Sequence, residues 1–270
     1  MTAGGPDRPG GVFSRSFGHG PRNVLAVHCS LAHSGAWRRL AGEMAEDITL
    51  TAFDMLSHGR SPDWDGTGNY QLLNADAGLA LLDRPADLIG HSFGATVALR
   101  MAMARPHLVR SLTLIEPVLF AVAKSDAPAA FAALEAASRP IEAAWAAADL
   151  ALTARLFNRM WGAGEPKWPD MPEQARAAMV RAIPVVPACY PTLYDDANGT
   201  LAPGALDPVA MPVLLLHGSE SPAVIGAIVS GFSRRLANAR ALSVPGAGHM
   251  LPVTHAAETA QLLRGFWGPA

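Results

Sequence analysis

The stretch that decides the fold spans residues 87–104 and reads DLIGHSFGATVALRMAMA. Its apolar start predicts a buried strand, and its later apolar residues recur at helical spacing. Between the two, GHSFG at 90–94 fits the pattern Gly-x-Ser-x-Gly around Ser92. This pattern is typical of a sharp strand-to-helix turn, in which the glycines let the two arms pass closely. Such a turn exposes the hydroxyl of Ser92 beside a helix N-terminus. A passive serine in a tight structural turn is the alternative.

Strands and helices alternate on both sides of this turn. Short apolar runs bounded by turn residues or helical patterns predict buried strands at 24–28, 48–53, 86–89, 112–116, 213–217 and 241–244. Helical spacing predicts helices at 37–44, 72–82, 94–104, 223–236 and 256–266. This order predicts an α/β fold, with a mostly parallel central sheet flanked by helices on both faces. Ligands in such folds bind beyond the C-terminal ends of the strands.

One interval, from about residue 118 to 206, contains no convincing strand. Its first part is rich in alanine, with apolar pairs at helical spacing, and a second helical pattern follows near residues 171–183. A structureless loop of this length is improbable in a compact domain. We therefore expect residues 118–206 to form a helical cap or lid over the strand ends. Extra helices packed on the side of the sheet are the alternative.

The domain boundaries follow from this reading. Residues 1–20 begin with a segment rich in glycine and proline, so we expect a flexible N-terminal lead there. Residues 21–117 and 207–270 would then form one α/β core, interrupted by the helical insertion.

The composition is that of a globular protein with a substantial buried core. Half of the 270 residues are apolar, 16% are charged, and the formal net charge is −2. Without a long basic run, nucleic acid is not an expected partner, and apolar stretches are too short for a membrane span. The two cysteines, Cys29 and Cys189, are expected as free thiols in the cytoplasm, with one disulfide as the alternative. The sequence has no metal-type cluster of Cys and His, so we expect no metal and no cofactor.

The chain resembles the α/β-hydrolase-fold enzymes over nearly its whole length. Four stretches carry the resemblance in the order that the family uses: VLAVHCSLAHSGAW, FDMLSHGRS, GHSFG and PGAGHMLP. The helical insertion also resembles that family's cap domain in its position. The resemblance implies the α/β-hydrolase fold and a serine hydrolase with Ser92 as its nucleophile, but it does not identify a substrate.

His249 is the strongest candidate for the general base, which a serine hydroxyl needs near neutral pH. It lies in GAGHM, after the last expected strand and before the final helix, where the resembling family places its triad histidine. An imidazole can accept and return a proton near neutral pH. A loop histidine facing solvent is the alternative. His58 and His91 are interpreted as scaffold residues near the site.

The third member of the triad departs from the family's pattern. Most relatives place an Asp where this chain has Ser221, and serine cannot carry the charge that stabilises an imidazolium. Glu116 ends the strand at 112–116, where some branches of the family place the acid, and burial there would require a partner. Glu220 lies one residue from the usual position. We favour Glu116 and keep Glu220 and a dyad without an acid as alternatives.

The resemblance also implies an oxyanion hole made by backbone N–H groups. One comes from the residue after the nucleophile, Phe93. The other would come from Ser30 in the stretch His28-Cys29-Ser30, where Cys29 stands in place of the family's usual glycine. Cys29 is interpreted as a small packed residue, not as a second nucleophile.

These residues favour hydrolysis of a small or medium apolar carboxylic ester through an acyl-serine intermediate. Lactone, thioester or C–C bond hydrolysis and perhydrolysis can use the same triad. A protein of another class, a binding or signalling protein of the same fold with weak turnover, is favoured by the departures at Ser221 and Cys29. The sequence assigns no substrate-binding residue and no oligomeric state.

Overall fold

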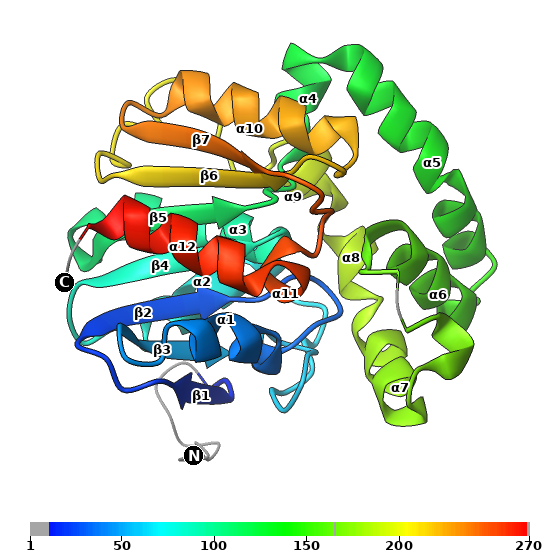
Figure 1. Ribbon diagram of the computed structural model, residues 1–270. Helices are drawn as coiled ribbons and strands as arrows, with labels where there is room; N and C mark the ends of the chain where they lie inside the picture. Colours follow the sequence, from blue (N-terminus) through cyan, green and yellow to red (C-terminus); the bar gives the residue numbers. More distant parts are fainter. Residues whose placement is uncertain (1–10, 165, 269–270) are drawn as a thin grey trace.

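A computed structural model describes residues 11–164 and 166–268. Seven strands form one sheet in the order β1-β3-β2-β4-β5-β6-β7, and every neighbouring pair is parallel except β1 with β3 (Figure 1). The expected α/β fold with a mostly parallel sheet is confirmed. The strands are β1 (Ser14–Phe17), β2 (Arg22–Val27), β3 (Ile48–Phe53), β4 (Ala86–His91), β5 (Val109–Ile115), β6 (Val213–Gly218) and β7 (Ala239–Val244).

Helices cover both faces of the sheet. On one face, η1 (Ser34–Trp37), α1 (Arg38–Glu43), α11 (Leu251–Thr254) and α12 (Ala256–Trp267) pack over a core that includes Trp37 and Leu40. On the other face lie α2 (Tyr70–Leu79), α3 (Phe93–Ala104) and α10 (Ala223–Arg235), with a short η2 (Pro106–Leu108) after α3. The central strand β4 is buried along its whole length, as a strand covered on both faces must be.

The segment between β5 and β6 is helical and contains no strand in its described part. Its helices α5 to α8 lie beyond the arrowheads of the parallel strands, on the right of Figure 1. The segment holds α4 (Phe120–Asp126), α5 (Pro128–Ala146), α6 (Leu150–Trp161), η3 (Trp168–Asp170), α7 (Glu173–Ala182), α8 (Val185–Ala188) and α9 (Tyr190–Tyr194).

Two polar contacts tie this helical segment to the sheet domain. Arg181 of α7 forms an ion pair with Asp63, at 2.7 Å, and donates to two backbone carbonyls of the loop at 59–61. On the other side, the Asn198 side chain bonds to Asn69 and Gln71 at the start of α2. The helical segment is thus bonded to the sheet domain through Arg181 and through Asn198.

The expectation of a flexible lead up to residue 20 is wrong for residues 14–17, which form β1. This strand pairs with β3 in antiparallel register, with Ser14 opposite Phe53 and Phe17 opposite Leu50. The reason is its edge position: a strand with one neighbour and one exposed flank keeps polar residues and gives little apolar signal. Residues 1–10 of the predicted lead lie outside the described residues.

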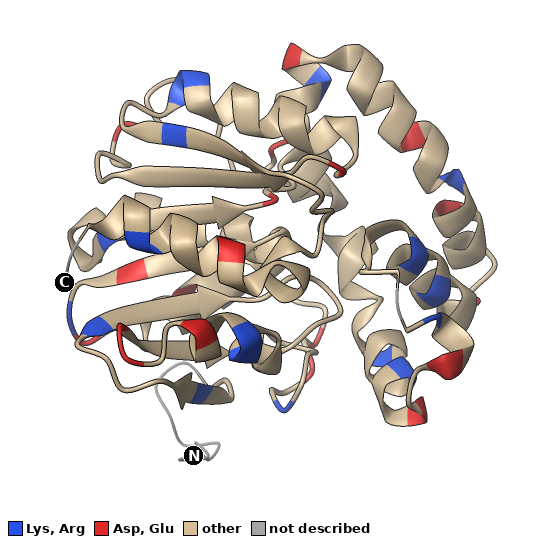
Figure 2. Ribbon diagram, viewed as in Figure 1, with Lys and Arg blue, Asp and Glu red and all other residues tan. Residues whose placement is uncertain are grey.

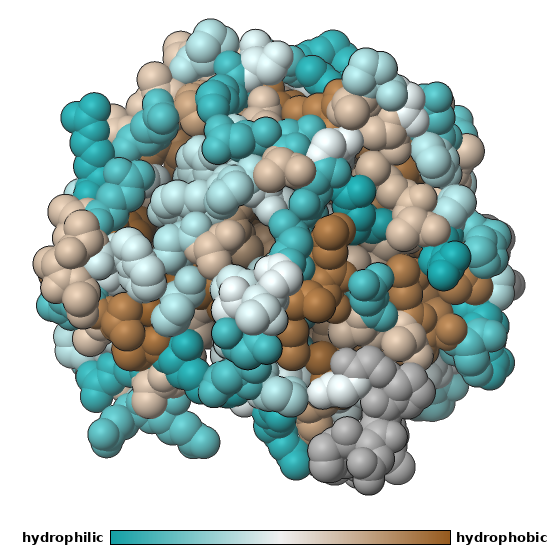
Figure 3. Space-filling view, turned by 180° about the vertical axis from the view of Figure 1, so that it is seen from behind, coloured by the Kyte–Doolittle hydropathy of each residue, from teal (hydrophilic) through white to brown (hydrophobic). Residues whose placement is uncertain are grey.

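The surface is mixed in charge and polarity. Basic and acidic residues are interspersed along the ribbon (Figure 2), and apolar patches are bordered by hydrophilic residues on the face in Figure 3. No helix in the described ranges is long and apolar enough to cross a membrane. Cys29 and Cys189 are both free and buried, as expected.

Candidate active site

Ser92 lies at the turn between β4 and α3, in a backbone conformation that few residues adopt. Its φ of 56° and ψ of −119° cost about 1–3 kcal/mol of strain. The turn is held by its own N–H group, which donates to Ile115 O at 2.8 Å. Glycine is required on both sides: a Cβ at Gly90 would lie 2.3 Å from Gly94 O, and one at Gly94 would lie 2.3 Å from Val27 O. The local sequence thus forces the turn.

His249 lies in the loop between β7 and α11 and faces Ser92. Its Nε2 atom is 2.9 Å from Ser92 Oγ, and both residues are buried. The backbone carbonyl of His249 accepts a hydrogen bond from His91 Nε2 at 2.7 Å. His91 therefore holds the loop in place from beneath the turn, which agrees with its reading as a scaffold residue.

Glu116 follows β5 directly and binds the other side of the His249 ring. Its Oε2 atom lies 2.8 Å from Nδ1, and Oε1 accepts from the Gly218 N–H at 2.6 Å and the Ser221 hydroxyl at 2.8 Å. Burial alone would raise the pKa of Glu116, but His249 and the two donors outweigh it and hold this pKa below its usual value. The carboxylate is therefore ionised, so Nδ1 carries a proton and the Nε2 lone pair faces Ser92.

The structure separates the two candidate acids. Glu220 is exposed, its backbone N–H donates to Ala247 O, and within the described residues it has no hydrogen bond to His249. Ser221, which occupies the position of the family's usual Asp, donates to Glu116 instead. The three side chains that meet are Ser92, His249 and Glu116.

Two buried histidines hold the loop that carries Ser30. His28 accepts from the Met55 N–H and donates to Cys29 O, while His58 Nε2 accepts from the Leu31 N–H at 3.0 Å. Sequence reasoning identified His58 as scaffold but gave His28 no role. Burial lowers the pKa of His28 to about 3 and of His58 to about 4, so both stay neutral and can serve as acceptors.

Cys29 is a packed residue, as expected. It is 5% exposed, and its Sγ atom lies 4.0 Å from Met250 Sδ. Burial raises the pKa of its thiol to about 12, so the reactive thiolate is not populated near neutral pH.

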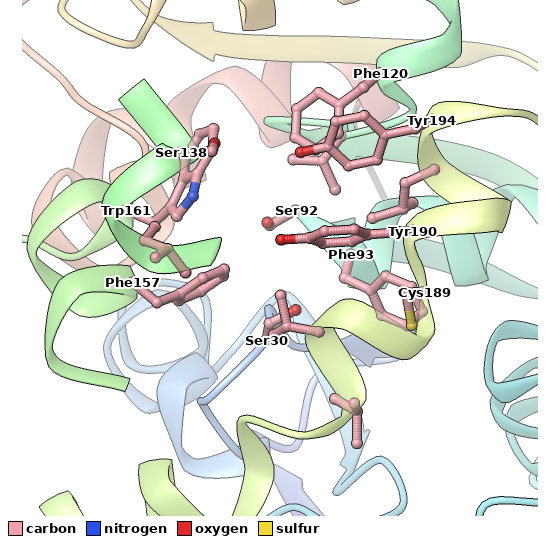
Figure 4. A pocket seen from close by; sticks show the side chains of 15 residues that line it. Ser30, Ser92, Phe93, Phe120, Ser138, Phe157, Trp161, Cys189, Tyr190 and Tyr194 are labelled. Carbon is pink, nitrogen blue, oxygen red and sulfur yellow. The ribbon is translucent and has the colours of Figure 1, made fainter. Parts of the chain in front are cut away.

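Two spaces meet at Ser92. The first, which we call the inner pocket, has about 600 Å³ of atom-free space and is lined by Ser92, Ser30, Phe93 and side chains of α4, α5, α6, α8 and α9 (Figure 4). The second, which we call the groove, has about 1950 Å³ of atom-free space and runs from His249 past the loop at 28–36 to α7. A ligand centred on Ser92 can therefore extend in two directions.

Trp161, the last residue of α6, packs against the imidazole of His249. The two ring centroids are 4.7 Å apart, and Trp161 lines both the inner pocket and the groove. Nothing local in the sequence indicated the contact, because it joins residues 88 positions apart.

No group of three or more His, Cys, Asp or Glu residues is arranged to hold a metal ion in the described chain. The site offers a hydroxyl, an imidazole and a carboxylate in hydrogen-bonded series, next to a helix N-terminus whose first N–H groups have no intrahelical partner. This arrangement can move a proton from Ser92 to His249 while Glu116 stabilises the resulting charge.

Known proteins resemble this chain in sequence and in fold. The model of the alpha/beta hydrolase family matches residues 24–262. A pimeloyl-[acyl-carrier protein] methyl ester esterase of Methylococcus capsulatus is 29% identical over 265 residues, covering 95% of this chain and 98% of that enzyme. Lipase LipV of Mycobacterium tuberculosis is 41% identical over 104 residues, or 37% of this chain and 39% of the lipase. The structure of an alpha/beta hydrolase from Sphaerobacter thermophilus has a TM-score of 0.70 at 20% identity, covering 99% of this chain and 100% of that one.

Proposed function

Given that this chain belongs to the alpha/beta hydrolase family and is a hydrolase, we propose that it cleaves carboxylic esters through an acyl intermediate on Ser92. The observation that carries the proposal is the continuous chain of hydrogen bonds from Ser92 Oγ to His249, at 2.9 Å, and from His249 to Glu116, at 2.8 Å. The same order of nucleophile, base and acid activates serine in several unrelated folds.

In the proposed reaction, Ser92 Oγ attacks the ester carbonyl carbon while His249 Nε2 takes its proton. The carbonyl oxygen becomes an oxyanion, which the backbone N–H groups of Phe93 and Ser30 stabilise. When the tetrahedral intermediate collapses, His249 gives the proton to the leaving alcohol. Water, activated by the same imidazole, then attacks the acyl carbon and releases the acid. Glu116 stabilises the imidazolium in both halves of the cycle.

The helical segment at 118–206 serves in this proposal as a cap over the site. Supporting it, the inner pocket beside Ser92 is lined by side chains from five of its helices, among them Phe120, Ile141 and Trp161. Removing water from around the oxyanion strengthens the hydrogen bonds that stabilise it. A cap in this position would also select substrates by the shape of the acyl or alcohol group.

An ester is the favoured substrate over a lactone, a thioester or a C–C bond for two reasons. The relatives reported above are named as a methyl ester esterase and a lipase, and the inner pocket is mainly apolar, which suits an apolar acyl group. The alternative of a binding protein loses one of its two supports in this proposal, because Glu116 bonds to His249 and Ser221 and so can supply the carboxylate that position 221 lacks.

The proposal is tested by steady-state hydrolysis of p-nitrophenyl butyrate, with Ser92→Ala as the matched control. We expect saturable turnover by the wild type and a loss of about 10⁴-fold or more in kcat for the variant. Equal rates for both proteins would contradict a role for Ser92, and absence of turnover on every ester tried would favour the binding protein.

A further inference from the structure

The two spaces at Ser92 differ in which catalytic groups face them. Among the described residues, His249 lines the groove and does not line the inner pocket. Phe93, which supplies one of the proposed oxyanion donors, lines the inner pocket and is absent from the lining of the groove. Ser30 and Ser92 line both. The site is therefore asymmetric about the reacting carbon.

This asymmetry fixes the direction of an ester in the site. This inference rests on the proposed function, in which the leaving oxygen takes its proton from His249 Nε2. The leaving oxygen must therefore lie on the imidazole side of the tetrahedral carbon. That side opens into the groove. The acyl chain then extends from the carbonyl carbon in the other direction, past Phe93.

We propose that the inner pocket is the acyl site, that it takes an uncharged, mainly apolar acyl group, and that the groove holds the leaving alcohol. The sizes agree with this assignment. The inner pocket has about 600 Å³ of atom-free space and the groove about 1950 Å³, so the acyl group is the more restricted part of the substrate.

The walls of the inner pocket determine the chemistry of the acyl group. Figure 4 shows aromatic side chains around the space in front of Ser92, with the hydroxyl groups of Tyr190 and Tyr194 directed into it. In the part of the chain that the structure describes, no Lys, Arg or His lines this pocket. An apolar chain is therefore favoured, and a carbonyl or hydroxyl group within it can receive or donate a hydrogen bond at the two tyrosines.

A carboxylate on the acyl chain is disfavoured. Burial raises the pKa of both tyrosines, and the negative charge of Glu142, outside the pocket on α5, raises them further. The same charge would oppose an anion in the pocket. Lys124 contacts the backbone carbonyl of Tyr194 but is paired with Asp195. A carboxylate in the inner pocket would thus lose its hydration without a positively charged side chain to pair with.

A pair of pocket-filling variants tests the direction of binding. Val186 of α8 lines only the inner pocket, and Ala178 of α7 lines only the groove, so Val186→Phe and Ala178→Phe each narrow one space. The measurement is kcat/KM for two ester series: acyl chains of rising length on p-nitrophenol, and alcohols of rising size on butyrate.

We expect Val186→Phe to lower the octanoate-to-acetate ratio of kcat/KM by roughly tenfold or more and to leave the alcohol series in the wild-type order. Ala178→Phe should lower the ratio of 1-naphthylmethyl to methyl butyrate by roughly fivefold and leave the acyl series in order. The opposite pattern would overturn the assignment while leaving the esterase proposal intact. If the wild type hydrolysed none of these esters, the proposed function itself would fail, and the assignment with it.

The charge of the acyl group is tested on p-nitrophenyl esters of equal chain length. We expect kcat/KM to be lower by roughly tenfold or more for the adipic acid monoester than for the hexanoate. For the uncharged 5-oxohexanoate, kcat/KM should equal or exceed the value for the hexanoate. If it is higher, Tyr190→Phe should bring it back to the hexanoate value. Equal kcat/KM values for the adipate and the hexanoate would overturn the proposal that the acyl group is uncharged.

Discussion

Replacing Glu116 by glutamine tests its proposed role sharply, because the change keeps the shape of the side chain and removes its charge. In the wild type, Oε1 accepts from the Gly218 N–H and the Ser221 hydroxyl, and Oε2 faces His249 Nδ1. A glutamine would keep its carbonyl oxygen toward those two donors, so its NH₂ group would face Nδ1. Two donors then meet, unless the imidazole moves its proton to Nε2, where it points at Ser92.

The size of the effect follows from this tautomer. An imidazole protonated on Nε2 cannot accept the Ser92 proton, and the imidazolium also loses the negative charge that lies 2.8 Å away in the wild type. The corresponding change of Asp to Asn in serine proteases lowers kcat by roughly 10⁴-fold. We expect Glu116→Gln to lower kcat by roughly 10³- to 10⁴-fold, equivalent to about 4–5 kcal/mol of transition-state stabilisation.

The assay is steady-state hydrolysis of p-nitrophenyl butyrate near pH 7.5, with circular dichroism to show that each variant is folded. Glu220→Gln is the matched control, because Glu220 is exposed and its backbone, not its carboxylate, makes the contact to Ala247. We expect the control to stay within about twofold of the wild type. A Glu116→Gln variant with turnover near that of the wild type would refute the reasoning.

Three further predictions follow from the same contacts. The double variant Glu116→Gln/Ser221→Asp should have a kcat roughly tenfold or more above that of the single variant Glu116→Gln, because residue 221 already reaches the carboxylate beside the imidazole. A kcat no higher than that of the single variant would contradict this. Removing the carboxylate of β4 by Asp87→Ala should lower the unfolding free energy by about 2 kcal/mol, measured by urea titration, since the fully buried Asp87 accepts from two arginines and a serine. The free energy of unfolding should fall steeply in acid. Burial lowers the pKa of three histidines from 6.5 to about 3 or 4: His28, His58 and His91. These imidazoles therefore stay neutral in the folded protein at pH values where they are charged in the unfolded one. Stability is therefore complete above about pH 6.5 and declines as the pH falls toward about 4, with a slope on the order of 4 kcal/mol per pH unit near pH 5; urea titrations at several pH values measure it, and a flat profile between pH 6.5 and 5 would contradict it.

Much of the fold was predictable because its decisive features are local in the sequence. The strand β4, the turn at Ser92 and the helix α3 follow one another without interruption. The turn requires glycine at positions 90 and 94, because a Cβ at either would lie 2.3 Å from a backbone oxygen. The parallel strands are buried on both faces and are therefore continuous apolar runs. The short edge strand β1 (Ser14–Phe17) was missed because three of its four residues are polar.

The site was predictable only where a residue type and its position agree. Glu116 was favoured because a carboxylate at the end of a buried strand needs a partner, and the structure supplies His249 at 2.8 Å. The hydrogen bond from Ser221 and the packing of Trp161 against the imidazole were not predictable. Both depend on how segments distant in sequence pack against each other, which periodicity and local motifs do not encode.

The most direct test of the account is to locate the covalent adduct formed with a fluorophosphonate probe, by peptide mass spectrometry of the whole protein after labelling. The account predicts one adduct, on Ser92 Oγ, which forms rapidly in the wild type and far more slowly in His249→Ala, because the imidazole activates the hydroxyl across 2.9 Å. An adduct on another residue, or ester hydrolysis that persists in a protein with Ser92 fully blocked, would contradict it.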